Sequence, residues 1–195
     1  MNRSLILGGL LGGLVAFAWN AFSWSVLPFH ASTLRPFRDQ AAVTRVLQDE
    51  APASGIYALP SPDLDRPGLS KAEKKAARDS MMARSQRGPN AFVAIRLGKL
   101  TSVGMRMGRA LVISILGALL LTWIVLQTAA IGFVGRMRVV ATAALTAGVI
   151  AELPNWNWWG FSTGYTVANL ADLVIGWFLA GLVIARVTTG RTRRG

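Results

Sequence analysis

Apolar residues along this chain are gathered into long blocks, and polar residues fill the stretches between them. The blocks cover residues 5–27, 110–131, 139–153 and 167–185. An α-helix rises about 1.5 Å per residue, so about 20 apolar residues cross a hydrocarbon core of roughly 30 Å. The third block is short, and interfacial residues around Gly135 and Trp156 complete its length. The pattern predicts transmembrane helices over residues 1–28, 110–131, 135–155 and 167–187.

The first block follows Arg3 at the start of the sequence, where a secretory signal peptide would also lie. Its apolar stretch is longer than the roughly 7 to 15 residues of a signal-peptide core. A clear small-x-small cleavage motif does not follow it. We therefore expect the first block to be an uncleaved membrane anchor.

The stretch between the first two blocks, residues 29–109, has the pattern of a small folded module. Residues 40–50 are amphipathic, with Asp39 as a candidate N-cap and Pro52 just beyond the end. The runs "SGIYALP" and "NAFVAIRLG" predict two strands. The charged run between them predicts a helix that begins with a capping box of Ser70 and Glu73.

Two strands alone are marginally stable in water, so this module must pack on something else. A partner could add a strand to an exposed sheet edge. Packing as a lid on the chain's own helices is the favoured alternative. The sequence thus predicts an all-α integral membrane protein with four transmembrane helices and a small α+β extracytoplasmic insert between the first and second.

The Lys and Arg residues that flank the blocks predict how the chain is threaded. When the four helices alternate in direction, one side of the membrane receives Arg3, Arg136, Arg138, Arg186, Arg191, Arg193 and Arg194. The loop 154–166 on the other side has no Lys or Arg. By the positive-inside rule both termini are cytoplasmic, residues 188–195 form a basic cytoplasmic tail, and residues 29–109 are extracytoplasmic. The insert is itself basic, but so long a segment is less bound by this rule.

Composition agrees with a membrane protein, since 52% of the 195 residues are hydrophobic and only 15% are charged. The net charge of +12 suggests nucleic acid at first. The basic residues, however, flank the membrane blocks or belong to the mixed-charge insert. We expect membrane lipids and other membrane protein subunits as partners, and no nucleic acid. The chain has no Cys, which excludes disulfides and thiolate metal sites.

Small and aromatic residues mark where the helices pack and where they meet the interface. The first block contains two overlapping small-xxx-small pairs, Gly8 with Gly12 and Gly9 with Gly13. Packing inside the bundle is favoured over dimerisation through these glycines. The expected interfacial anchors are Trp19, Trp24, Trp156, Trp158 and Trp159. Residues 156–166 are read as an aromatic interfacial loop, with Pro154 ending the third helix and Gly160 turning the chain.

Five polar side chains fall in the predicted outer leaflet or at its edge. They are Asp172, Asn169, Glu152, His30 and Asn20. A charged group at the centre of a transmembrane helix costs about 2.5–3.5 kcal/mol, so such residues are candidates for function. One hypothesis is that they converge on a ligand or a proton, with Asp172 as the best candidate.

Three other interpretations of these residues are open. The asparagines and Asp172 could hydrogen-bond between helices while Glu152 and His30 are hydrated, and this is favoured over a metal site. Arg106 or Arg109 could neutralise Glu152. A haem is less expected, because the single His supplies only one axial ligand. No metal and no cofactor are therefore predicted.

Catalytic motifs are missing from the sequence. It contains no GxxxxGK[ST], no HExxH, no GxSxG with a downstream His and no Gly-rich dinucleotide turn. We therefore expect a non-catalytic accessory or assembly subunit of a larger membrane complex. The alternative is a lipid-, quinone- or proton-handling protein that uses the region of Asp172, and an enzyme using His30 and Glu152 ranks third.

Three segments carry a resemblance to known proteins: "LPFH" after the first block, "APASGIYALP" in the insert, and "LPNWNWWGFSTGYTVANLADLVIGWFLAGLVIA" near the end. In these the chain resembles small four-span bacterial inner-membrane proteins of unassigned function. The resemblance implies a bacterial inner membrane. It implies no activity and no catalytic residue.

Overall fold

The computed structural model describes residues 3–62, 64, 67–128 and 131–189. The chain divides into two compact units. Unit 1 combines residues 1–35, 100–156 and 161–195, and unit 2 combines residues 36–99 and 157–160. The long apolar helices belong to unit 1, and the small sheet belongs to unit 2.

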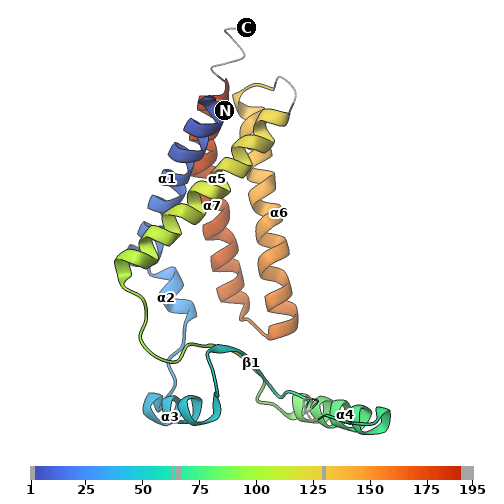
Figure 1. Cartoon of the computed structure of the whole chain (residues 1–195). Coiled ribbons are helices and arrows are strands. Elements are labelled where there is room, and N and C mark those ends of the chain that lie inside the picture. The colour runs from blue at the N-terminus through green and yellow to red at the C-terminus, as the bar shows by residue number, and fades with distance from the viewer. Residues whose placement is uncertain (1–2, 63, 65–66, 129–130, 190–195) are drawn as a thin grey trace. The chain divides into compact units, whose positions relative to one another are not determined.

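Unit 1 is helical (Figure 1). Its helices are α1 (Arg3–Val26), α2 (Phe29–Thr33), α5 (Val103–Gln127), α7 (Thr163–Thr189) and α6 (Phe133–Trp159), of which residues 157–159 belong to unit 2. All but the short α2 are long and apolar enough to cross a membrane. The prediction of four such helices is confirmed, although residues 129–130, near the end of the second predicted helix, lie outside the described residues.

The second long helix begins earlier than predicted, at Val103 rather than Ala110. Ser102 is the reason, because its hydroxyl oxygen accepts a hydrogen bond from the Met105 N–H at 3.3 Å and caps the helix. Arg106 and Arg109 therefore lie on the first two turns of α5.

Helix α6 passes through Pro154 and continues to Trp159. The prediction that Pro154 ends the helix is wrong, and residues 156–159 are helical rather than part of a loop. A proline removes one backbone donor, and transmembrane helices tolerate it when side chains satisfy the freed groups. The donor that Pro154 lacks would bond to the Ile150 carbonyl, and the Asn155 amide donates one residue further on, to the Ala151 carbonyl at 2.9 Å. The chain turns at Gly160, whose φ of 71° suits a glycine.

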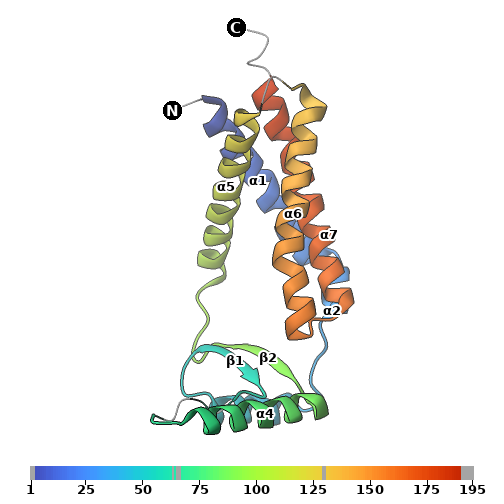
Figure 2. The same ribbon diagram turned by 90° about the vertical axis from the view of Figure 1, so that its right-hand side faces the viewer.

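Glycines bring α1 close to its neighbours, α5 and α7 (Figures 1 and 2). A Cβ on Gly8 would lie 2.6 Å from Thr122, and one on Gly13 would lie 2.5 Å from the Cα of Ile115. A Cβ on Gly12 would lie 2.8 Å from Ile184 of α7. Gly9 similarly faces Leu119 of α5. All four glycines thus contact helices of the same unit.

Unit 2 contains α3 (Gln40–Glu50), β1 (Gly55–Leu59), α4 (Lys71–Arg87) and β2 (Ala91–Ile95). The strands are antiparallel, with Tyr57 opposite Val93. Both predicted N-caps are confirmed. Asp39 accepts a hydrogen bond from the Ala42 N–H at 2.9 Å, and Ser70 and Glu73 form a complete capping box.

Very little of unit 2 is buried. Within the described part of residues 36–99, Ala51 alone falls in the buried class. Neither α3 nor α4 contributes a buried residue. Large apolar side chains such as Val46, Ile56 and Leu59 are more than half exposed. The described residues of unit 2 thus have regular secondary structure without a buried hydrophobic core of their own.

Candidate functional site

The candidate site is built around Asp172 in α7. The helix begins at Thr163, so Asp172 lies two and a half turns, about 13 Å, along it. The residue is only 5% exposed. One turn later, Gly176 leaves room for an indole ring, because a Cβ there would lie 2.7 Å from Cδ1 of Trp19. The sequence of α7 thus sets a carboxylate beside a space that Trp19 fills.

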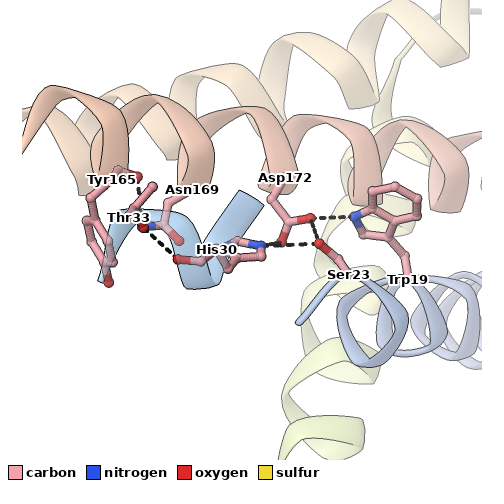
Figure 3. A network of polar contacts seen from close by, with 7 residues as sticks. All are labelled: Trp19, Ser23, His30, Thr33, Tyr165, Asn169 and Asp172. Carbon is pink, nitrogen blue, oxygen red and sulfur yellow. Dashed lines mark hydrogen bonds and ion pairs between the residues drawn. The ribbon is translucent and has the colours of Figure 1, made fainter. Parts of the chain in front are cut away.

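Two side chains of α1 donate hydrogen bonds to Asp172 (Figure 3). Nε1 of Trp19 lies 2.8 Å from Oδ1, and the Ser23 hydroxyl lies 2.6 Å from the same oxygen. These residues are four apart, so they share one face of the helix. Both donors point at the carboxylate because that face packs on α7.

His30 approaches the other carboxylate oxygen from α2. Its Nε2 lies 3.4 Å from Oδ2 of Asp172 and 3.1 Å from Oγ of Ser23. The ring is 3% exposed and stacks on Trp24, with ring centroids 3.9 Å apart and planes 13° apart. Phe29 packs on it as well, at 4.3 Å. The short helix α2 is therefore tied to both α1 and α7.

A Ser, a His and an Asp in contact suggest a hydrolytic triad, but the geometry differs. In a triad the two ring nitrogens bridge the nucleophile and the carboxylate separately. Here the single atom Nε2 faces both partners, and the Ser23 hydroxyl donates directly to Asp172. Ser23 is also completely buried. The arrangement satisfies polar groups and holds three helices together, and it presents no nucleophile to a substrate.

A cavity of about 400 Å³ lies next to this network, within unit 1. It is lined from α1, α5, α6 and α7. Its polar lining includes Asn20, Glu152, Asn169 and Asp172. Four of the five sequence candidates therefore border one space. The fifth, His30, contacts Asp172 but is not part of the lining.

The other candidates have fewer contacts than Asp172. Asn169 donates its amide to the Tyr165 carbonyl of its own helix at 3.0 Å, so it does not bridge two helices as expected (Figure 3). Glu152 is partly buried, and neither it nor the exposed Asn20 makes a hydrogen bond or ion pair with any residue in the described part of the chain. The proposed Glu152 pairing with Arg106 or Arg109 is accordingly not observed.

Sequence reasoning missed Ser23 and the role of Trp19. The indole N–H of Trp19 bonds to Asp172 instead of being left for a lipid headgroup. A signal for both was present, because Gly12, Ala16, Trp19 and Ser23 follow one another at steps of four, three and four along one helix face. That stripe is the face of α1 turned toward its neighbours.

The other aromatic anchors have no place in the network. Trp156 donates its indole N–H to the Thr163 hydroxyl at 3.1 Å, across the turn between α6 and α7. Trp24 covers His30, and Trp158 and Trp159 are exposed. The residues that the structure describes hold no group of three or more His, Cys, Asp or Glu side chains suited to a metal ion.

Comparison with protein-family models, with curated proteins and with solved structures gives no match.

Proposed function

We propose that this protein is a non-catalytic accessory or assembly subunit of a larger complex in a bacterial inner membrane. The observation that carries the proposal is the missing core of unit 2. A segment of this size that buries one small residue gains little from its own packing. Its ordered helices and strands are explained if another surface covers them.

The state of the polar network supports the same proposal. Asp172, Ser23 and His30 are buried and partnered with one another, as expected of groups that fix helix positions. A catalytic group would instead need contact with a substrate. The network serves to hold unit 1 in one shape for a neighbouring subunit.

The membrane orientation is part of the proposal. Arg3, Arg136, Arg138 and Arg186 lie near the helix ends on the side of both termini, which favours a cytoplasmic location for that side. Residues 29–109 are then extracytoplasmic. Reporter fusions after residue 60 and after residue 190 test this, and the proposal requires opposite compartments for the two reporters.

Partner capture tests the accessory role. The tagged chain is expressed from its own locus, extracted in a mild detergent, and analysed by mass spectrometry and size exclusion. We expect a second membrane protein in fixed stoichiometry that survives a change of detergent. A chain that elutes alone under several mild detergents contradicts the proposal.

A second candidate function, handling of a lipid, a quinone or a proton, is favoured by the cavity beside Asp172. The substitution Asp172→Asn separates the two candidates because it keeps the shape of the side chain and removes its charge. If assembly with the partner persists while the cellular function is lost, the ligand- or proton-handling role is supported. If function also persists, the structural role of Asp172 is supported.

A further inference from the structure

The cavity in unit 1 is lined by acidic, amide and aromatic side chains. Its charged members are the carboxylates of Glu152 and Asp172. Among the described residues that line it, none is Lys or Arg. The Ser114 hydroxyl and the indole side chains of Trp19, Trp24 and Trp177 complete the polar and aromatic lining. This lining favours a positively charged ligand, because carboxylates and indole faces both attract cations.

The two carboxylates differ in whether they already have hydrogen-bonding or ionic partners. Asp172 already accepts hydrogen bonds from Trp19 and Ser23 and faces His30. Glu152 has no hydrogen-bonding or ionic partner within the described part of the chain. An unpaired carboxylate in a transmembrane helix is costly, and a bound cation would offset that cost.

Two amide oxygens accompany Glu152 in the lining. Asn169 uses its Nδ2 to donate to the Tyr165 carbonyl, which leaves its Oδ1 as an acceptor. Asn20 supplies another amide oxygen. The cavity therefore offers carboxylate, amide and hydroxyl oxygens outside the Asp172 network, from Glu152, Asn20, Asn169 and Ser114. A primary ammonium can donate its N–H groups to such oxygens, whereas a quaternary ammonium has no N–H to donate.

A basic residue continues the lining toward the start of α5. The cavity residues of this helix are Ala110, Ile113 and Ser114. Arg106 lies four residues before Ala110 and is exposed, so it shares their face one turn nearer the helix start. On this face Arg106 is the basic residue one helical turn before Ala110, and we take it as the partner of an anionic group attached to the ammonium, because a guanidinium pairs well with phosphate.

We propose that this cavity binds a primary ammonium linked to a phosphate, with Glu152, Asn169 and Asn20 as acceptors and Arg106 beside the phosphate. The volume of about 400 Å³ lies within the usual range for small-molecule sites. The chemistry is that of a phosphoethanolamine group, either as a phospholipid headgroup or as a free molecule. This site does not depend on the accessory role; it rests on the second candidate function, lipid handling at the cavity beside Asp172, and names the ligand.

The test uses the full chain in lipid nanodiscs that hold equal amounts of phosphatidylethanolamine and phosphatidylcholine with identical acyl chains. Native mass spectrometry measures which lipid stays bound. We expect enrichment of phosphatidylethanolamine, and Glu152→Gln lowers that enrichment about tenfold or more because a charge-assisted hydrogen bond is lost. Glu50→Gln, the same change on the exposed surface of α3, leaves it unchanged.

Equal retention of the two lipids by the wild-type chain overturns the proposal, whatever happens to the variants. An equal loss of enrichment in Glu152→Gln and Glu50→Gln overturns it too. Added water-soluble phosphoethanolamine then identifies the source: displacement of the bound lipid indicates that a free molecule suffices, and no displacement indicates a lipid headgroup. Partner capture from the same samples reports on the accessory role separately.

Discussion

The two units of this protein expose apolar side chains for different reasons. In unit 1, exposed residues such as Leu14 and Ile113 lie on helices long and apolar enough to cross a membrane, where lipid chains are the solvent. In unit 2, Ile56 and Leu59 are equally exposed on a two-stranded sheet, and neither α3 nor α4 is among the helices long and apolar enough to cross a membrane. We propose that lipid covers the exposed apolar residues of unit 1 and that a partner surface covers those of unit 2.

The polar residues of the two units differ in burial. Unit 1 buries Asp172, His30 and Ser23 and pairs them with one another, since lipid offers them no hydrogen bonds. The charged residues that the structure describes in unit 2 are exposed, as in the ion pair of Lys75 with Asp79 at 2.7 Å. The hydrogen bond of Lys75 to Asp79 and the negative charge of Asp79 raise the pKa of Lys75. The capped helices α3 and α4 are the other polar feature of unit 2. The free energy of unfolding should therefore depend on buried polar contacts in unit 1 and on helix capping in unit 2.

The largest expected effect is that of Asp172→Ala. The substitution leaves the donors of Trp19 and Ser23, together with His30, facing a buried space without an acceptor. We expect the free energy of unfolding to fall by about 3 kcal/mol or more. Intrinsic tryptophan fluorescence during denaturation in detergent measures the loss.

Asp172→Asn provides the graded comparison, since it keeps one acceptor oxygen for the donors of α1. The free energy of unfolding of this variant should lie between those of the wild type and of Asp172→Ala. Asp49→Ala, an exposed carboxylate in α3, serves as control and should leave unfolding unchanged. An equally small effect of Asp172→Ala would contradict the view that the network holds unit 1 together.

Gly13→Ala should have the next largest effect. The added methyl would lie 2.5 Å from the Cα of Ile115, and backbone atoms cannot move aside as a flexible side chain can. Helix α1 must then shift from α5, at a cost of about 1–3 kcal/mol. Gly108→Ala is the matched control, because a Cβ there meets nothing within 4 Å. Improved helix propensity makes that variant neutral or up to about 1 kcal/mol more stable.

Much of the fold could be predicted from the sequence, because its signals are local. Runs of apolar residues predict the four long helices, and the caps at Asp39 and Ser70 predict where α3 and α4 begin. The end of α6 was mispredicted at Pro154. A proline lowers helix stability locally, so a helix is expected to end there. In this structure the helix continues, and the Asn155 amide bonds to the Ala151 carbonyl, a contact that the sequence rule for proline does not predict.

The candidate site was predictable in its members but not in its pairing. Asp172 and His30 stand out as rare ionisable residues in apolar surroundings, so both could be named. Their contact, and the contacts of Ser23 and Trp19, depend on how α1 rotates against α7. That rotation is set by the glycines of α1, by Gly176 and by the side chains they admit. The spacing of Gly12, Ala16, Trp19 and Ser23 marks the packed face of α1, but it does not say which residues of α7 that face meets.

A smaller effect is expected from Ser70→Ala. This change removes the hydroxyl that accepts from the Glu73 N–H and opens the capping box of α4. We expect a loss of about 1 kcal/mol confined to unit 2, measured by faster amide hydrogen exchange in the first turns of α4. Ser80→Ala, on the exposed middle of the same helix, should leave exchange there unchanged or slower.

The smallest effect on stability is expected for Ile56→Ser, which sharpens the contrast between the two units. Ile56 is 63% exposed, so its replacement should change the free energy of unfolding by no more than about 0.5 kcal/mol. If a partner subunit covers unit 2, the same substitution should reduce the amount of partner that co-purifies, while Ala76→Ser on α4 should not. A stability loss well above this value with unchanged co-purification would instead mean that Ile56 packs against the chain's own residues. Unit 2 would then be a lid on its own helices, and the missing core would no longer argue for an accessory role.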